Sequence, residues 1–387
     1  MTPDAAPRVA IVHDWLDTWG GAENVLVELL RAYPDAELYT LVDFLPDALR
    51  ARIGGRRART TFLQRVPGTR RNFRMLLPLF PRAIESLDLS AHDLVISNSH
   101  AVAKGVRTTP AQLHVCYCHT PMRYAWDLRD QYLAPRGLAA GWKGVLAHRV
   151  LDRLRVWDRH ASGRVNEFAA NSEFVRERVA RCYGRTAAVI HPPVDTTFFT
   201  PPAHGTAPAR DYYFAASRWV PYKRIDLVAR AFRDLPDRRL VIAGDGPERA
   251  RVRAAAGPNV EFVGAVPQEA LRDLLRGARA FVFAAEEDFG ILPVEAQACG
   301  TPVIAFGRGG ARETVRDRAD GHPTGLFFDE QTPEALVAAV RRFEADFPPP
   351  AAADCRANAQ RFSTERFHRE WAAFVARAQD AFRRRGG

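Results

Sequence analysis

"RVAIVHDWLDTWGGAENVLVELL", residues 8–30, is the stretch that decides the fold class of this chain. It starts with an unbroken apolar run, continues through a polar loop that contains Gly20 and Gly21, and ends with apolar residues at helical spacing. A continuous apolar run is typical of a strand buried on both faces, and apolar residues three and four positions apart indicate an amphipathic helix. The stretch therefore predicts a strand–loop–helix unit of a parallel sheet.

The same rhythm recurs along the chain and predicts two domains. It returns in "HDLVISNSHAVAKGV" and "VNEFAANSEFVRERVARCYG", and restarts after a stretch rich in Pro, Ala and Gly at residues 198–211. We predict an α/β protein with two Rossmann-like, doubly wound domains facing across a cleft, the GT-B arrangement, over residues 1–200 and 201–363. The amphipathic helix at residues 364–387 is expected to pack back toward the N-terminal domain.

The composition is that of a soluble protein with 387 residues, 47% of them hydrophobic, and a net charge of +10. No apolar run is long enough to span a bilayer, and no secretory signal is expected, so we expect a cytoplasmic protein whose five cysteines stay reduced.

Basic charge concentrates in "RIGGRRARTTFLQRVPGTRRNFRMLLPLFPRAIE", residues 52–85, where arginines alternate with large apolar residues. Such a segment fits either an anionic membrane surface, with the protein peripheral on the inner face of the cytoplasmic membrane, or a solvated surface. Nucleic acid is not an expected partner, because no nucleic-acid-binding module accompanies the charge.

Candidate binding residues of the first domain follow its predicted strands. Gly20 and Gly21 precede a helix, where backbone N–H groups can approach an anion, although a tight turn explains them equally well. His119, Arg123 and Tyr124 follow a later strand in "LHVCYCHTPMRYAWD".

The second domain offers two cations in one loop, Arg218 and Lys223, which would stabilise a diphosphate. The turn "GDGPE", with Gly244 and Gly246, resembles a dinucleotide turn but lacks the G-x-G-x-x-G spacing. Val263 is expected beside a nucleotide base.

Glu287 and Glu295 stand eight residues apart in "EEDFGILPVE", one before a predicted helix and one inside it. They could form a metal site, an acid/base pair or two grips on a polyhydroxylated ligand. A metal would need further ligands, which the segment lacks, and nothing supports a hydrolase-type pair. Two carboxylates suit the hydroxyls at the two ends of a nucleotide sugar, with phosphates at the backbone N–H groups of residues 289–292 between them. That backbone belongs to Phe289, Gly290, Ile291 and Leu292.

These motifs together resemble retaining glycosyltransferases of family four. The resemblance rests on "EEDFGILPVE" with "AQACGTPVIAFGRGGARETV", on "ASRWVPYKRIDLVARAF" and on "VIAGDGPE", in that order. "VHDWLDTWGGAE", "VISNSHAVAKGV" and "CHTPMRYAWD" look most like bacterial mannosyltransferases that use GDP-mannose to build O-antigen or exopolysaccharide. Asp288 departs from the family, which usually has glycine there.

The resemblance implies roles for the candidate residues. Glu295 would hold the ribose and Glu287 the transferred sugar. Arg218 and Lys223 would bind the diphosphate, and Gly20 and Gly21 would lie beside the donor phosphates. His119 would lie near the reacting sugar. The expected catalytic set is thus His119, Arg218, Lys223 and Glu287, with His119, Arg123 and Tyr124 toward the acceptor.

The implied reaction moves a sugar from a nucleotide diphosphate to a saccharide or a polyprenyl-diphosphate-linked acceptor, with no metal or other cofactor required. GDP-mannose is the expected donor, and GDP-rhamnose or a UDP-sugar is the alternative. A sugar-nucleotide epimerase would reuse the same residues. A nicotinamide-dependent oxidoreductase would need the missing glycine motif, and a phosphorylase would need a lysine for pyridoxal phosphate in a suitable context.

Overall fold

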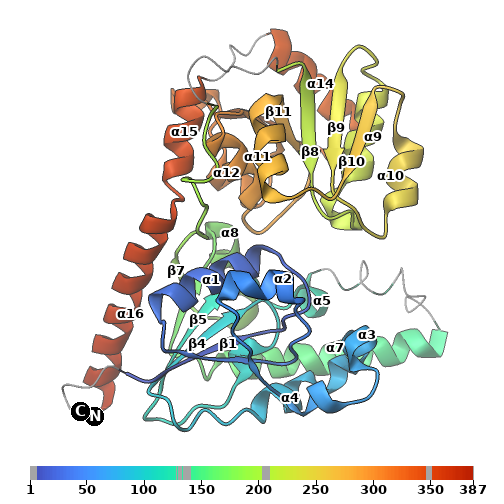
Figure 1. Ribbon diagram of the computed structural model, residues 1–387. Coiled ribbons are helices and arrows are strands. Elements are labelled where there is room, and N and C mark those ends of the chain that lie inside the picture. The colour runs from blue at the N-terminus through green and yellow to red at the C-terminus, as the bar shows by residue number, and fades with distance from the viewer. Residues whose placement is uncertain are drawn as a thin grey trace. The chain divides into compact units, whose positions relative to one another are not determined.

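The computed structural model describes residues 7–127, 129, 133, 141–202, 210–345 and 351–386. The chain forms two compact units, of which the first comprises residues 1–191 with 367–387 and the second residues 192–366 (Figure 1). The division thus falls at the Pro192–Pro193 pair, a few residues before the position expected from the sequence.

The first unit is built on a parallel sheet of seven strands in the order β3-β2-β1-β4-β5-β6-β7. The strands are β1 (Val9–His13), β2 (Glu37–Thr40), β3 (Arg59–Thr60), β4 (Leu94–Ser99), β5 (Leu113–Cys118), β6 (Glu167–Ala170) and β7 (Ala188–Val189). The strand order reverses between β1 and β4, and such a switch point is where open parallel sheets bind ligands.

Helices of very different lengths accompany this sheet. They are α1 (Gly21–Ala32), α2 (Asp47–Arg50), α3 (Thr69–Asn72), α4 (Phe80–Glu85), α5 (Arg123–Trp126), α7 (Gly141–Ser162) and α8 (Glu173–Tyr183). The ends of α8 follow the sequence: Ser172 accepts a hydrogen bond from the backbone of Val175 at 3.1 Å, and Gly184 ends the helix in a left-handed conformation.

The basic stretch at residues 52–85 folds as a succession of short turns. It contains η1 (Ala51–Ile53), η2 (Phe62–Arg65) and η3 (Phe73–Leu79) besides α3 and α4. Glycine and proline explain the breaks, because Gly54, Gly55 and Gly68 adopt positive φ angles and Pro78 lies inside η3.

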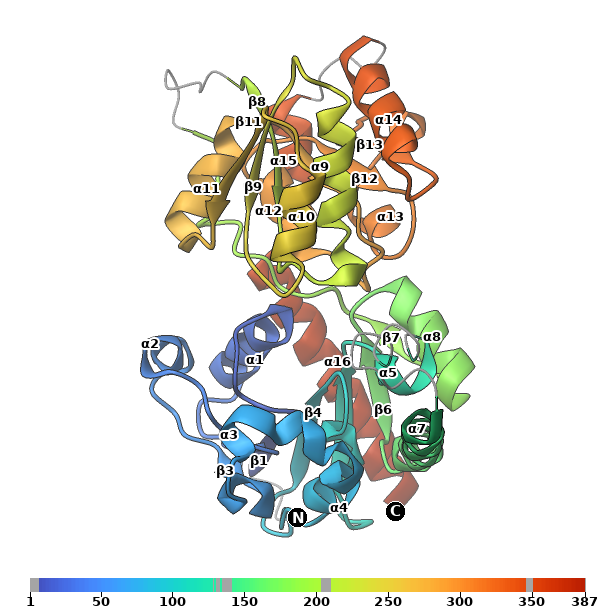
Figure 2. The same ribbon diagram turned by 90° about the vertical axis from the view of Figure 1, so that its right-hand side faces the viewer.

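The last helix, α16 (Thr364–Gly386), brings the end of the chain back to the first unit (Figures 1 and 2). Phe367 and Trp371 are buried in the same apolar cluster as Tyr117 of β5, at ring distances of 5.9 Å from the tyrosine. His368 contacts Glu28 of α1 at 2.8 Å. The apolar face of the helix therefore completes a core that begins at the other end of the sequence.

The second unit holds a parallel sheet of six strands in the order β10-β9-β8-β11-β12-β13. The strands are β8 (Tyr212–Ala216), β9 (Arg239–Ala243), β10 (Val260–Gly264), β11 (Ala278–Phe283), β12 (Val303–Phe306) and β13 (Gly325–Phe328). The helical segments are η6 (Pro221–Lys223), α9 (Ile225–Arg233), α10 (Arg249–Ala255), α11 (Gln268–Gly277), α12 (Ile291–Ala298), α13 (Ala311–Thr314), η7 (Arg318–Asp320), α14 (Pro333–Ala345) and α15 (Ala352–Gln360). Its switch point lies between β8 and β11.

Both units thus show the doubly wound, Rossmann-like architecture that the sequence predicts, which is the pair of sheets that defines the GT-B fold. Within the described ranges, no helix is both long enough and apolar enough to cross a bilayer. All five cysteines are buried as free thiols.

Candidate active site

Three polar side chains meet at the carboxyl end of the first sheet, beside its switch point. His13 ends β1 and is paired in register with Asn98 of β4. His119 follows β5, and its backbone N–H donates to the carbonyl of Ser99 at 2.8 Å. The side chains of all three are buried. Parallel pairing therefore assembles a cluster whose members are far apart in the sequence.

A continuous chain of hydrogen bonds joins this cluster to the glycine loop. The Nε2 atom of His119 lies 2.6 Å from Oδ1 of Asn98, and the amide Nδ2 of Asn98 lies 3.1 Å from Nδ1 of His13. His13 Nε2 contacts Glu23 at 3.2 Å, and Glu23 accepts the backbone N–H of Gly20 at 2.7 Å. Gly20 is the N-cap of α1, so the chain reaches the helix N-terminus.

One carbonyl fixes the direction of every bond in this chain. Asn98 Nδ2 lies 2.9 Å from the backbone oxygen of Ala22, which can only accept, so the amide nitrogen must face it. The amide oxygen then accepts from Nε2–H of His119, and the amide nitrogen also donates to Nδ1 of His13. His13 consequently donates from Nε2 to Glu23. Neutral His119 keeps its Nδ1 as a hydrogen-bond acceptor.

Burial keeps the histidine neutral. The pKa of His119 lies well below its ordinary value, chiefly because burial disfavours the charged ring and also because His100 and His13 are close. Burial alone would raise the pKa of Glu23, but the hydrogen bond from His13 holds that pKa below its ordinary value, so the carboxylate is ionised.

Asp14 holds the neighbouring loop in place. Its two carboxylate oxygens accept the backbone N–H groups of residues 100–103 at 2.6–3.0 Å. His100 Nδ1 also lies 3.0 Å from this carboxylate. Burial opposes ionisation, but the charge of His100 and these backbone donors lower the pKa of Asp14. The loop that follows β4 is thereby fixed around an ionised side chain.

The other candidates of the first unit lie around this cluster. Gly21 is the first residue of α1. Arg123 and Tyr124 open the short helix α5, which follows His119 by a few residues, and both side chains are half-buried. Tyr124 packs against an apolar cluster of the unit, so its ring contributes to the core as well as to this edge.

In the second unit, the predicted residues Lys223 and Glu287 form an ion pair. Lys223 ends η6 after β8, and Glu287 follows β11, the neighbouring strand. Both side chains are mostly buried, with 17% and 19% of their surface exposed. Arg218, in the same loop as Lys223, is exposed. The pair therefore joins two loops at the carboxyl edge and leaves the arginine facing solvent.

The glycines of "GDGPE" let two loops pack together. A side chain at Gly244 would collide with the backbone of Ser217, and one at Gly246 would collide with the backbone of Trp219. Trp219 donates its backbone N–H to Asp245 at 2.9 Å. The turn after β9 thus supports the loop that carries Arg218, a role that does not require the glycines to touch a ligand.

A second glycine pair supports the acidic loop. Gly310 donates its backbone N–H to the carbonyl of Glu287 at 2.9 Å, and a side chain at Gly310 would collide with the backbone of Phe289. A side chain at Gly309 would likewise meet the backbone of Glu287. Close backbone approach therefore sets the position of the loop that precedes α12.

The N-terminus of α12 carries no side-chain cap among the described residues. Its N-cap, Gly290, has a φ of 89°, and Ile291 and Leu292 begin the helix. Their N–H groups lack helical acceptors and can bind an anion, as predicted from the sequence. The ring of Phe289 is buried against Phe362 at 5.5 Å, so Phe289 can offer a ligand only its backbone.

The remaining candidates of the second unit are largely covered. Glu295 lies on α12 with 8% of its surface exposed, and Val263 of β10 is half-buried against an apolar cluster. Asp288 is 9% exposed, which places its side chain inside the loop packing.

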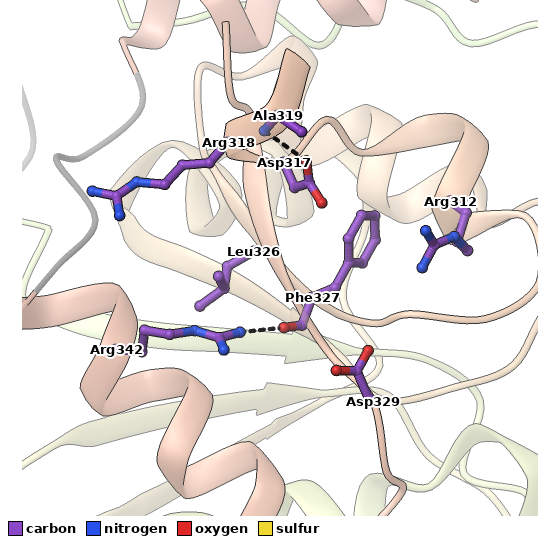
Figure 3. A pocket seen from close by; sticks show the side chains of 8 residues that line it. All are labelled: Arg312, Asp317, Arg318, Ala319, Leu326, Phe327, Asp329 and Arg342. Carbon is purple, nitrogen blue, oxygen red and sulfur yellow. Dashed lines mark hydrogen bonds between the residues drawn. The ribbon is translucent and has the colours of Figure 1, made fainter. Parts of the chain in front are cut away.

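A depression of about 720 Å³ lies elsewhere in the second unit, at the edge strand β13 (Figure 3). It is lined by Arg312, Asp317, Arg318, Ala319, Leu326, Phe327, Asp329 and Arg342, none of them a predicted site residue. Arg342 donates to the backbone oxygen of Phe327 at 2.6 Å, so one of the cationic side chains that line the depression already has a hydrogen-bond partner within the protein.

Sequence reasoning missed His13, Asn98 and Asp14. Two signals could have found them: "VHDW" places an imidazole and a carboxylate directly after an apolar strand, and "ISNSH" interrupts a second strand with an amide. Within the described residues, no three His, Cys, Asp or Glu side chains are grouped so as to hold a metal ion.

Family comparisons agree with this arrangement of two Rossmann-like units. Residues 19–198 match the family described as Glycosyltransferase Family 4, and residues 199–362 match Glycosyl transferases group 1. The chain therefore belongs to the family four glycosyltransferases with the GT-B fold.

Two kinds of curated relative resemble this chain over part of its length. A GDP-mannose-dependent alpha-(1-6)-phosphatidylinositol monomannoside mannosyltransferase of Mycolicibacterium smegmatis is 35% identical over 45% of this chain and 52% of that protein. A D-inositol 3-phosphate glycosyltransferase of Mycobacterium sp. (strain KMS) is 32% identical over 52% of this chain and 53% of its own. Each match thus spans about half of the relative.

Solved structures share the fold over nearly the whole chain. Sucrose-phosphate synthase from Thermosynechococcus elongatus has a TM-score of 0.71 at 19% identity, covering 97% of this chain and 100% of its own. Anabaena HepE, solved with UDP and glucose, has a TM-score of 0.67 at 18% identity, covering 96% and 100%. At these identities the likeness concerns the fold alone.

Proposed function

We propose that this chain transfers a mannosyl group from GDP-mannose, with retained anomeric configuration, to a hydroxyl of a lipid-linked saccharide in bacterial surface polysaccharide synthesis. The observation that carries the donor side is the Lys223–Glu287 pair, which lies in the loops beside the open N-terminus of α12. This combination offers a cation and backbone N–H groups to a diphosphate and a carboxylate to a sugar. The similarity to the curated GDP-mannose-dependent mannosyltransferase supports guanine as the base and mannose as the sugar of the proposed donor.

The proposed chemistry breaks the bond between the sugar C1 atom and the diphosphate oxygen and forms a bond from C1 to the acceptor oxygen. The acceptor oxygen attacks C1 from the face that the phosphate oxygen leaves, so the anomeric configuration is retained, and the acceptor proton passes to that departing oxygen. Arg218, Lys223 and the N–H groups of Ile291 and Leu292 stabilise the charge that develops on the diphosphate. These groups already supply positive charge, so the proposal requires no metal or other cofactor.

The carboxylates and the histidine orient the donor. Glu287 accepts hydrogen bonds from the transferred sugar, and Glu295 accepts them from the ribose. His119, neutral and with Nδ1 as an acceptor, receives a hydrogen bond from a sugar hydroxyl. In this proposal Gly20, Gly21, Arg123 and Tyr124 serve the acceptor and the donor phosphates.

A thermal-shift series with GDP, UDP, ADP and dTDP tests the donor, because a ligand raises the unfolding temperature according to its affinity. We expect the largest shift with GDP. A larger shift with UDP would replace GDP-mannose by a UDP-sugar. Release of free sugar from GDP-mannose without any acceptor would indicate the alternative activity, a sugar-nucleotide epimerase or hydrolase.

Glu287→Gln separates the two halves of the donor site. The substitution removes the carboxylate that pairs with Lys223, so the ammonium becomes available to phosphate. We expect GDP to bind equally well or more tightly, while mannosyl transfer falls about 100-fold because the sugar contact is weakened. Loss of GDP affinity in Glu287→Gln would show that the carboxylate organises the phosphate site and would contradict its assignment to the sugar.

A further inference from the structure

Helix α7 exposes an apolar row to solvent. Trp142, Val145, Leu146 and Val156 are 74%, 53%, 56% and 59% exposed. Their spacing of three, one and ten residues places them on one side of a helix with 3.6 residues per turn. Arg149 and Arg153 fall on the same side and are also exposed. We call these six residues the α7 stripe.

The stripe is not a displaced part of the core. The opposite side of α7 buries Leu151, Leu154 and Ala161 against the unit. Trp157 donates to Glu85 of α4 at 2.8 Å, which fixes the rotation of the helix. Figure 2 views α7 nearly end-on at the margin of its unit, and Figure 1 shows its N-terminal end extending past the neighbouring helices. One face of α7 is therefore packed against its unit, and a second apolar face is exposed to solvent.

A second patch of the same composition lies in the neighbouring segment, in and around η2, α3, η3 and α4. Phe62, Met75 and Leu79 are exposed there, and with the α7 stripe they account for all seven exposed large apolar side chains of the described residues. No acidic residue occurs between Asp47 and Glu85, while five exposed arginines accompany the patch. They are Arg65, Arg70, Arg71, Arg74 and Arg82. Both segments also contribute to one apolar core cluster.

Charge decides which partner fits. The stripe itself contains two arginines and no acid, and the nearby Asp152 already pairs with Arg129 at 2.5 Å. A second copy of the chain would bring Arg149 and Arg153 against the same basic surface, which costs free energy. An anionic bilayer instead offers phosphate groups to the guanidinium groups and an apolar layer to the Trp, Val and Leu side chains. A tryptophan at one end of the row suits the membrane interface.

We propose that the α7 stripe docks the first unit on an anionic membrane surface, with Trp142 as its inserted anchor and the basic patch at residues 62–82 as a second contact. The inference deepens the proposed function, since a lipid-linked acceptor would then be met at the surface that holds the enzyme. Docking itself requires no sugar transfer and can be measured without it.

Flotation with vesicles of phosphatidylcholine, pure or mixed with phosphatidylglycerol, tests the proposal on the full chain. We expect wild type to float with the mixed vesicles and to stay largely free with the neutral ones. Arg149→Gln with Arg153→Gln should weaken binding to anionic vesicles about 25-fold, because each arginine at such a surface contributes about fivefold. Trp142→Ser with Leu146→Ser should weaken it at least as much.

A matched control removes the same charge in the second unit. Arg230 and Arg233 are exposed on α9, and Arg230→Gln with Arg233→Gln should leave flotation at the wild-type level. GDP-induced thermal shifts and circular dichroism establish that each variant is folded. Equal flotation of the stripe variants and wild type would overturn the proposal. So would a wild type that ignores anionic vesicles but forms a dimer that the stripe variants lose, because the stripe would then be an interface between copies. Transfer to a water-soluble acceptor reports on the proposed function separately.

Discussion

Replacing Asn98 by aspartate changes a single atom type in the hydrogen-bond chain that holds His119. In the wild type, the amide oxygen of Asn98 accepts from His119 at 2.6 Å and its nitrogen donates to His13 at 3.1 Å. A carboxylate can still accept from His119, but it cannot donate to His13 or to the carbonyl of Ala22. The substitution therefore places a buried negative charge between two imidazoles.

The expected size of the effect follows from Coulomb's law. Two unit charges about 4 Å apart attract by about 4 kcal/mol at an effective dielectric constant near 20, which corresponds to about 3 pKa units. Burial now holds the pKa of His119 well below its ordinary value. Asn98→Asp should raise that pKa back toward its ordinary value, so that His119 becomes protonated as the pH falls and loses its acceptor at Nδ1.

The pH dependence of kcat/KM between pH 5 and 9 measures this change. We expect a new acid limb in Asn98→Asp that wild type lacks, with a matching titration of ring resonances in histidine-labelled protein. Asn358→Asp is the control, since Asn358 is another buried amide, which donates to Gln297 and to the backbone of Thr314 in the second unit. That variant should lose stability without gaining the acid limb. An unchanged profile for Asn98→Asp would refute the proposal that the reaction needs a neutral His119 with Nδ1 as an acceptor.

Three further predictions concern stability and the donor loop. Burial lowers the pKa of His114 to about 3, so below pH 6.5 the unfolded chain binds a proton at this residue and the folded chain does not. Lowering the pH from 7.5 to 5 should therefore destabilise wild type by about 2 kcal/mol through His114. The variant His114→Gln should lack this part of the loss, as measured by urea unfolding at both pH values. Gly310→Ala should weaken GDP binding at least tenfold in calorimetry, because the added methyl group would collide with the backbone of Phe289. Gly321→Ala is the control, since Gly321 has a φ of 75° and a methyl group there would have no atom within 4 Å. It should lower stability by only about 1 kcal/mol and leave GDP binding intact. Lys104→Met removes the cationic partner of Asp158 from a fully buried ion pair and should lower the free energy of unfolding by about 3–5 kcal/mol, as measured by thermal unfolding. A loss below about 1 kcal/mol would contradict the contribution assigned to this pair.

The sheets were predictable because most of their strands are built around apolar runs. The runs that form β1, β4 and β12 contain few polar residues before their carboxyl ends. The apolar run therefore predicts the strand, and the first polar residues after it predict where the next loop begins. Lys223 and Glu287 were predictable for the same reason, since both follow such strands. The N-cap of α8 at Ser172 is a residue type that favours this position, so local chemistry also accounts for a helix boundary.

Helix α7 was not predicted, and its surface explains why. Apolar residues lie on its buried side, as at Leu151, and also on its exposed side, as at Trp142 and Val156. Two apolar faces blur the helical period that a single face would show. The breaks within residues 52–85 are the converse case, since glycine and proline interrupt a stretch that resembles a continuous amphipathic segment.

Asn98 could not be assigned a role from the sequence, because its partners His13 and Ala22 lie 85 and 76 residues away. Only the register between β1 and β4 brings them together. The sequence analysis expected the helix at residues 364–387 to pack toward the N-terminal domain, and in the structure α16 contributes to the core of the first unit.

The hydrogen-bond chain from Gly20 to His119 also limits how this protein can evolve. His13 and Asn98 each accept on one side and donate on the other, while Glu23 accepts on both sides, so a residue of opposite polarity at any one of these positions leaves a buried neighbour facing donor to donor or acceptor to acceptor. Reversing the donor–acceptor direction of this hydrogen-bond chain therefore requires substitutions at several positions together. In a divergent descendant, Glu23, His13 and Asn98 should therefore be kept as a set or lost as a set.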